Sequence, residues 1–278
     1  MMTRTDHVTA HELARSPIQV ASQDIGLLPT CGMKPSATQT ANPELGPAIE
    51  IPASLYRFRR PLNWQNSSAS NSAQQRSENG PPEYQAIANR TNYGQRYLYD
   101  INGQPVTNTP IVVVHETAAT SQSTITFFQT YHTNDNNQAS YHTLITLNGD
   151  IVYIVPPDLR AFGAGNSVFQ GETVKTDPKL PPSVNNFAYH VSLETPPGGL
   201  NGGASHRGYT MAQYQSLAWL IARTGIPENR ITTHKAVDRS GERSDPRSFD
   251  QQLFLQLLRR YPKTQEIIIG CQAPSANQ

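Results

Sequence analysis

The sequence is poor in the features that mark several common classes of protein. Its 278 residues include only two cysteines, Cys31 and Cys271, too few for a disulfide framework or a four-cysteine zinc site. No apolar run approaches the roughly 20 residues that span a bilayer. The first sixteen residues also lack the apolar core of a secretory signal. We therefore expect no membrane span and no export signal, and any metal site must use nitrogen and oxygen ligands.

Charge is both scarce and balanced. Charged residues make up 15% of the chain, and 22 Lys and Arg against 21 Asp and Glu leave a net charge of +1. A protein that binds the phosphate backbone of nucleic acid needs a basic surface. We therefore expect no nucleic-acid partner and no electrostatic attraction to an anionic membrane.

The first part of the chain is rich in polar residues and proline. Half of the 22 prolines lie in the first 110 residues, mixed with Ser, Asn, Gln and Gly, as in the stretch 65–82. This composition without an apolar period is typical of linkers and disorder. We expect residues 1–50 to be a disordered tail and residues 51–110 an irregular arm or linker, in which 93–106 has enough aromatic residues to lie on a folded body.

From residue 111 onward the pattern predicts alternating strands and helices. The β-branched run IVVVH predicts a buried strand that delivers His115 to its carboxyl end. Residues 111–262 are therefore expected to form one α/β domain with a mixed sheet, followed by a tail at 263–278. The periodicity predicts further strands and helices in this domain: strands at 141–147, 150–155 and 188–194, and helices at 121–132, 211–224 and 249–261.

Local signals set the ends of these elements. Asn148-Gly149 lies between two of the strands and predicts a two-residue hairpin turn, since both residue types tolerate positive φ. Two pairs have the spacing of a helix-capping box, in which side chains satisfy free backbone N–H groups of the first turn: Thr210 with Gln213, and Ser248 with Gln251.

Two histidines and one aspartate are the candidates for a metal site. His115 ends the first strand, His234 lies in ITTHKAVD, and Asp245 lies in ERSDPRSFD. Each alone is more often structural, because a histidine at a strand end is commonly hydrogen-bonded and an Asp before Pro commonly starts a turn. Together they match the three-ligand set of a catalytic zinc site, whose fourth position is left to water.

Four segments in this region resemble one known family. VVHETA, SYHTLITLNGDIVYIVPPDLRAFGAG, NNFAYHVSLE and THKAVDRSGERSDPRSFD are similar, in this order, to blocks of the type 2 zinc-dependent N-acetylmuramoyl-L-alanine amidases. That family includes phage enzymes, a cell-wall-recycling enzyme and the peptidoglycan recognition proteins. The resemblance covers about residues 111–262. It implies a mixed sheet with helices on its faces, and one Zn²⁺ ion held by His115, His234 and Asp245.

The resemblance also implies catalytic helpers. In the phage and recognition-protein branch a Tyr precedes a His on the first hairpin strand, which makes Tyr141 the group that orients water or the scissile carbonyl. The alternative is a structural role for Tyr141, packed at the margin of the sheet. The recycling branch uses a Glu where this chain has Ser192. Glu194, two residues on and on the same strand face, is a substitute acid/base, and Glu116 ranks below it.

Other polar residues fall at positions of interest in the same family. Arg243 stands two positions before the last ligand, where relatives carry Lys, and we expect it to act electrostatically. Its alternative is a surface arginine paired with Glu242 or Asp238. His142 is a candidate for orienting a ligand or for contacting the transition state, and otherwise a histidine at the edge of the core.

The implied substrate is the amide bond between the lactyl group of N-acetylmuramic acid and L-alanine, in peptidoglycan or in muropeptides. Three further residues fall where relatives line the groove and are expected to bind substrate: Arg160, Asn185 and Asn186. The recycling enzyme has Trp-His-Ala-Gly where this chain has FGAG at 162–165, which puts anhydro-sugar selectivity in doubt.

Two other functions compete with this one. A non-catalytic muropeptide-binding module on the same scaffold would have lost its zinc ligands, whereas all three are present. A zinc peptidase would carry an HExxH pattern, which the sequence lacks. We expect a monomer, and the location stays open between the cell envelope, the outside of the cell and the cytoplasm.

Overall fold

The computed structural model describes residues 80–270. Eight strands have the following bounds: β1 Glu83–Gln85, β2 Tyr93–Gln95, β3 Ile111–Glu116, β4 Thr143–Ile145, β5 Ile151–Tyr153, β6 Leu159–Ala161, β7 Ala188–Leu193 and β8 Ile231–Thr233. The α-helices are α1 Ser121–Gln129, α2 Met211–Ala222, α3 His234–Val237 and α4 Gln251–Leu258. Four 3₁₀ turns connect them: Arg90–Asn92, Asp135–Asn137, Pro197–Gly199 and Glu228–Arg230. No helix in this part of the chain is long and apolar enough to cross a membrane.

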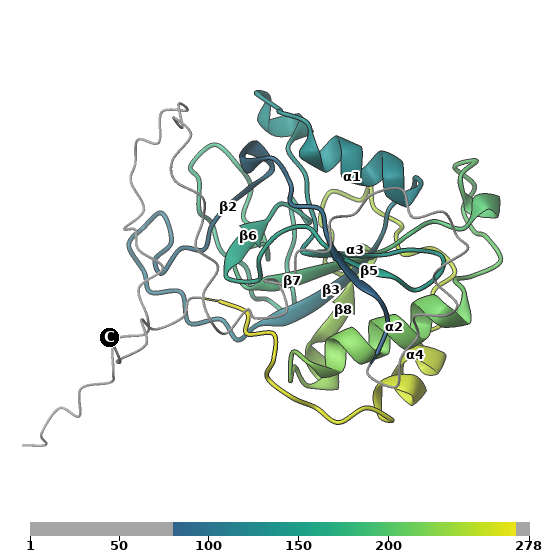
Figure 1. The fold of residues 1–278 in the computed structure, drawn as a ribbon. Helices are drawn as coiled ribbons and strands as arrows, with labels where there is room; N and C mark the ends of the chain where they lie inside the picture. The colour runs from purple at the N-terminus through teal and green to yellow at the C-terminus, as the bar shows by residue number, and fades with distance from the viewer. Residues whose placement is uncertain (1–79, 271–278) are drawn as a thin grey trace, which may run out of the picture.

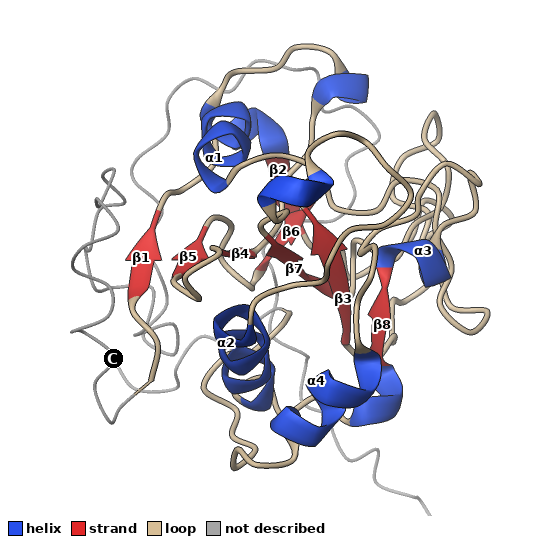
Figure 2. Ribbon diagram, turned by 90° about the vertical axis from the view of Figure 1, so that its right-hand side faces the viewer, coloured by secondary structure: helices blue, strands red, loops and turns tan. Residues whose placement is uncertain are grey.

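A mixed six-stranded sheet forms the centre of the molecule, in the order β1-β5-β4-β7-β3-β8 (Figure 1). Only β4 and β5 run antiparallel, and every other neighbouring pair is parallel. Helix α1 covers one face, and α2 and α4 cover the other (Figure 2). A separate antiparallel pair joins β2 to β6. The expected fold class, a mixed sheet flanked by helices, is confirmed.

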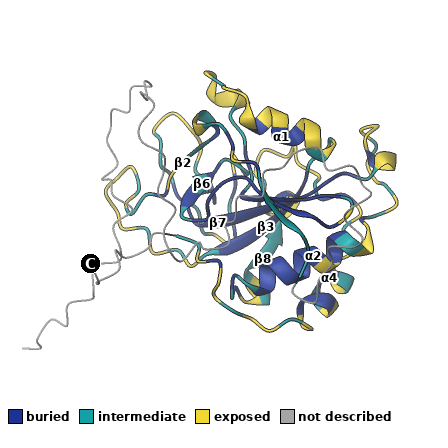
Figure 3. Cartoon of the chain, in the orientation of Figure 1, coloured by how far each residue is buried: buried dark blue, intermediate teal, exposed yellow. Residues whose placement is uncertain are grey.

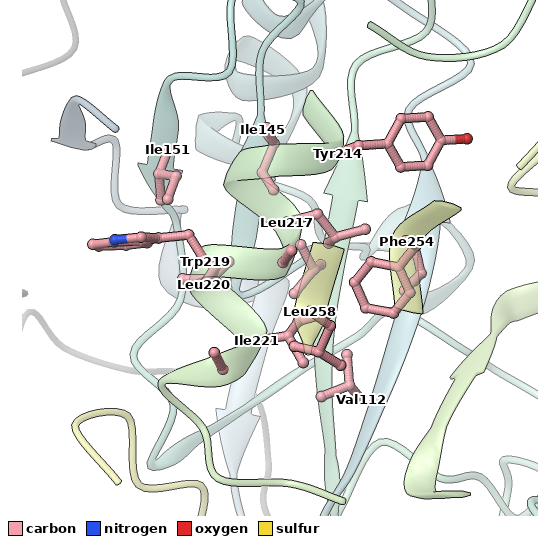
Figure 4. Close-up of a cluster of buried hydrophobic side chains, with 14 of the residues drawn as sticks. Val112, Ile145, Ile151, Tyr214, Leu217, Trp219, Leu220, Ile221, Phe254 and Leu258 are labelled. Atoms are coloured by element: carbon pink, nitrogen blue, oxygen red, sulfur yellow. The ribbon is translucent and has the colours of Figure 1, made fainter. Parts of the chain in front are cut away.

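The apolar core is concentrated between the sheet and helices α2 and α4. Side chains of β3, β4 and β5 meet both helices there (Figure 4). Leu217 of α2 is fully buried at the centre of this cluster. The central strands β3, β4, β5 and β7 are buried along their whole length, whereas the outer sides of the helices are exposed (Figure 3). Burial of apolar surface on this face anchors the sheet, and the polar site described below lies on the opposite face.

The β4–β5 hairpin is confirmed, but its turn differs from the prediction. The carbonyl of Thr146 accepts the N–H of Gly149 (2.8 Å), and Gly149 has a φ of 84°. Asn148 does not take a positive φ, so the expected turn with positive φ at both positions is wrong. The observed pattern is a three-residue loop closed by a left-handed glycine. A Cβ at Gly149 would lie 2.7 Å from the carbonyl oxygen of Ala212, so helix α2 fills the space that the glycine leaves.

One predicted helix cap is confirmed and the other is wrong. At α2, the Thr210 side chain accepts the N–H of Gln213 (3.1 Å), and the Gln213 side chain accepts the N–H of Thr210 (3.0 Å). At α4 the cap is Asp250, which accepts the N–H of Leu253 (2.9 Å). Ser248 lies before the helix with a φ of 53°. The helix therefore begins two residues later than its spacing predicted, because the Ser248 hydroxyl instead accepts the N–H of His206 (3.0 Å) from a distant loop.

The folded body extends on both sides of residues 111–262. β1 forms the sheet edge beside β5, and β2 pairs with β6, so residues assigned to an irregular arm take part in both sheets. These strands have three residues each, too few to show a period in the sequence. Ile267, in the expected tail, is buried in the α2–α4 core. The tail expected at 1–50 lies outside the described residues.

Replacing Leu217 tests the α2 core. We expect Leu217→Ala to lower the free energy of unfolding by about 2–5 kcal/mol, because the cavity cannot close fully between helix and sheet. Chemical denaturation monitored by circular dichroism measures this change. Gln215→Ala, an exposed change on the same helix, is the control and should stay within about 0.5 kcal/mol. Equal stability of the two variants would contradict this description of the core.

Candidate active site

Three predicted ligands meet at one edge of the sheet. His115 is the fifth of six residues of β3, and His234 begins α3 directly after the neighbouring parallel strand β8. Asp245 reaches them from the following loop. Its Oδ1 lies 2.9 Å from Nδ1 of His234, and its Oδ2 lies 3.5 Å from Nδ1 of His115. The ligand atoms of all three residues lie within 4.8 Å of one another.

The donor set fits a zinc ion. Nδ1 of His115 is buried without a hydrogen-bond partner in the described chain, while Nε2 lies 2.8 Å from Nδ1 of His190. Burial, and then the neighbouring His234, lower the pKa of His115 to about 4, which favours the neutral ring. Burial works to raise the pKa of Asp245, but the adjacent imidazoles of His115 and His234 outweigh it and hold that pKa well below its usual range. Neutral imidazoles and one carboxylate are ligands that zinc takes.

A buried ion pair holds the loop that carries Asp245. Oε2 of Glu116 accepts the backbone N–H of Arg247 (2.9 Å) and its Nε–H (3.1 Å), and Oε1 accepts from Nη2. The backbone N–H of Glu116 in turn donates to Oδ2 of Asp245 (3.2 Å). Since Glu116 follows His115 directly, this pair fixes the third ligand relative to the first.

Tyr141, expected to be a catalytic helper, lies beside His115. The centroids of the Tyr141 and His115 rings are 4.5 Å apart, and the edge of Phe128 packs on the other side of Tyr141 at 5.3 Å. Burial, and then the negative charge of Asp245, raise the pKa of the Tyr141 hydroxyl. The hydroxyl therefore keeps its proton at neutral pH and is a hydrogen-bond donor at this site.

Ser192 and Glu194, the two positions considered for an acid/base group, have structural roles. Ser192 is fully buried and is the direct strand partner of His115. Glu194 lies just beyond the end of β7, and its two carboxylate oxygens accept the N–H groups of Ser121 and Leu147, each at 2.8 Å. The start of α1 leaves such N–H groups free and attracts a negative charge. Glu194 therefore ties a helix to a hairpin, and the structure does not bring it into the metal cluster.

Arg243 is exposed at the rim of the cluster. Its backbone N–H donates to Asp238 (3.4 Å), and no described residue forms an ion pair with its guanidinium, including Glu242. Its positive charge lowers the pKa values of His115 and Tyr141, although burial has a larger effect on both. The geometry therefore suits the electrostatic role expected from the sequence better than the surface ion pair.

His142 belongs to the framework behind the cluster. Its side chain is fully buried. Nδ1 accepts the backbone N–H of His190 (2.9 Å), so Nε2 carries the proton and donates to the carbonyl of Leu159 (3.1 Å). None of these contacts joins His142 to His115, His234 or Asp245, so they fit the third reading of this residue, a histidine of the core.

The three residues expected to bind substrate lie against other parts of the chain. Oδ1 of Asn185 accepts the N–H of Ala164 (2.9 Å). The amide of Asn186 pairs with both backbone groups of Tyr97 at 2.8 Å. Arg160 stacks on the Tyr97 ring, with 4.8 Å between the guanidinium carbon and the ring centroid. The two asparagine side chains thus serve the fold, because they satisfy backbone groups of loops without regular partners.

Two residues that contribute to this framework were missed from the sequence: His190 and Arg96. His190 is fully buried on β7 and bonds directly to His115. A Cβ at Gly163 would lie 2.5 Å from its ring, so His190 fills the space beside that glycine. A charged or imidazole side chain inside a buried strand is unusual, and this is the signal that could have found His190. Arg96 had no such signal, because it lies outside any predicted element.

Removing one partner of the Glu116–Arg247 pair tests whether this ion pair holds the loop that carries Asp245. We expect Arg247→Met to lower the free energy of unfolding by about 3–5 kcal/mol, because it leaves a buried carboxylate unpaired. The double variant with Glu116→Gln should recover part of this loss. Denaturant titration of the three proteins measures both effects. That role is contradicted if Arg247→Met is as stable as the parent chain.

Comparison with known proteins finds a family match over the same part of the chain. The Amidase_2 family model, described as N-acetylmuramoyl-L-alanine amidase, matches residues 104–248. The 1,6-anhydro-N-acetylmuramyl-L-alanine amidase AmpD of Citrobacter freundii is 33% identical over 125 residues, which are 44% of this chain and 58% of AmpD. The match thus spans a little over half the length of that curated relative.

Solved structures of similar chains include two amidases. The solution structure of Citrobacter freundii AmpD is 26% identical, covers 64% of this chain and 91% of its own, and has a TM-score of 0.40. The amidase AmiD from E. coli, solved with anhydro-N-acetylmuramic acid-L-Ala-D-γ-Glu-L-Lys, is 21% identical, covers 60% and 65%, and has a TM-score of 0.42. Since the family model matches more than half of its residues, the chain belongs to the Amidase_2 family of N-acetylmuramoyl-L-alanine amidases.

Proposed function

We propose that this protein is a zinc-dependent N-acetylmuramoyl-L-alanine amidase, which hydrolyses the amide bond between N-acetylmuramic acid and L-alanine in peptidoglycan or muropeptides. The observation that carries the proposal is the cluster of His115, His234 and Asp245, with a buried nitrogen of His115 that has no hydrogen-bond partner in the described chain. The amide hydrolysis itself is inferred from membership of the amidase family. The name of the AmpD amidase and the anhydro-muropeptide bound to AmiD support muropeptide substrates.

The residues of the cluster divide into ligands and helpers. A zinc ion at such a site supplies Lewis acidity, which activates water and polarises an amide carbonyl. Tyr141 lies against His115, and its hydroxyl donates a hydrogen bond to the carbonyl oxygen as that oxygen gains negative charge. Arg243 stabilises the same charge from the solvent side. Both helpers thus stabilise the negative charge that develops on this oxygen.

The proton for the departing amine comes from a group other than a second carboxylate. Ser192 replaces the Glu of the recycling branch and is fully buried, and both oxygens of Glu194 are engaged by backbone N–H groups. Tyr141 is the helper that lies closest to the ligands, so we assign it the transfer. It accepts the proton of the attacking water as it passes its own proton to the amine, and the hydroxyl ends neutral.

Digestion of two substrates tests the reaction. We expect the zinc-loaded protein to release peptides that begin with L-alanine from intact sacculi, from anhydro-muropeptides, or from both, with the products identified by mass spectrometry. A chelator should abolish this activity and zinc should restore it. Full activity of the metal-free protein, or binding of muropeptides without cleavage of either substrate, would contradict the proposal, and the second result would indicate a binding module.

Two substitutions test the assigned roles. His234→Ala should abolish both zinc retention and turnover. Tyr141→Phe should keep zinc and lower kcat by about 10²–10³-fold, as for the loss of one oxyanion donor. Tyr131→Phe, at an exposed tyrosine near the end of α1, is the matched control and should leave kcat unchanged. The role of Tyr141 fails if its variant turns over like this control.

A further inference from the structure

A buried arginine lies outside the segment that matches the family model. Arg96 follows β2, is 3% exposed, and precedes the matched residues 104–248. Its Nε donates to the carbonyl of Pro157 (3.0 Å), Nη1 to those of Asn185 (3.4 Å) and Asn186 (2.9 Å), and Nη2 to that of Ala188 (2.9 Å). All four acceptors are backbone carbonyls. Arg96 has no role in the proposed amidase reaction.

These contacts fix the backbone that leads to His190. Three of the four carbonyls belong to the segment 185–188, which enters β7 two residues before His190. Nη2 of Arg96 also lies 3.1 Å from Nε2 of His142. Because Nε2 donates its proton to Leu159, this contact joins two donors and adds no hydrogen bond of its own. The other nitrogen of His142 accepts the backbone N–H of His190. Arg96 therefore supports His190 through the strand, and His142 supports it directly.

His190 in turn sets the orientation of the first ligand. The rings of His142 and His190 stack with 5.7 Å between centroids and 7° between planes. Nδ1 of His190 lies 2.8 Å from Nε2 of His115. If Nδ1 of His115 binds a metal, its proton must be on Nε2, and His190 is the acceptor for that proton. The opposite orientation of the His115 ring would lose this bond.

We propose that Arg96 and His190 are positioning residues of the metal site. Arg96 holds β7 in place, His190 accepts from Nε2 of His115, and Nδ1 of His115 is thereby directed at Asp245. The inference rests on the proposed function only in taking the ion to be zinc. It also extends the support of the metal site to Arg96, which lies before the family match.

Zinc affinity of the full chain tests this proposal without relying on turnover. The apparent Kd is measured by competition with a chromophoric chelator, after circular dichroism has shown that each variant is folded. We expect Arg96→Met and His190→Leu to weaken zinc binding by about 10–100-fold, the usual effect of losing a partner of a ligand. His190→Gln keeps an oxygen acceptor for Nε2 of His115 and should recover most of the affinity.

A matched control separates positioning from stability. Leu217→Ala destabilises the opposite face of the sheet and touches none of these residues, so it should bind zinc like the parent chain. The proposal is overturned if Arg96→Met binds zinc as tightly as Leu217→Ala, or if His190→Leu and His190→Gln bind equally. Should Arg96→Met not fold, Arg96→Lys keeps the charge but not the four carbonyl contacts, and must still bind more weakly than Leu217→Ala. If the parent chain binds no zinc, the proposed function fails instead.

Discussion

The hydrogen bond between Nε2 of His115 and Nδ1 of His190 determines which nitrogen of His115 can bind a metal. With Nε2 engaged behind the cluster, Nδ1 faces Asp245 and His234. The bond exists because β3 and β7 are neighbouring parallel strands in fixed register, which place both imidazoles on one face of the sheet. The geometry of the cluster is thus a consequence of strand pairing.

The two faces of the sheet have different tasks. The face toward α2 and α4 packs against the largest apolar cluster of the described chain. The other face buries histidines and an arginine, which is costly unless each polar group finds a partner. Here the partners are mainly backbone groups of loops, such as the carbonyls around Arg96 and the N–H of His190. These hydrogen bonds therefore hold the loops in place and also satisfy the buried polar side chains.

Sequence reasoning succeeded where a local pattern determines the structure. The β-branched run before His115 and the capping box at Thr210 are local signals, and the structure agrees with both. The His, His, Asp set was assigned through a family resemblance, and the structure brings its three residues together. Sequence reasoning failed where a side chain finds its hydrogen-bond partner in a segment that is distant in the sequence. Glu194 meets the free N–H of Ser121 at the start of α1, and that encounter follows from tertiary packing. Asp250 displaced Ser248 as a cap for a similar reason.

X-ray absorption spectroscopy of the zinc-loaded protein tests the central claim most directly, because it reads the atoms around the ion. We predict one zinc ion per chain with nitrogen and oxygen neighbours at about 2.0–2.1 Å, imidazole scattering from two histidines, and no sulfur. A shell with sulfur at about 2.3 Å, scattering from fewer than two imidazoles, or a protein that retains no zinc would contradict the assignment of His115, His234 and Asp245 as the metal site.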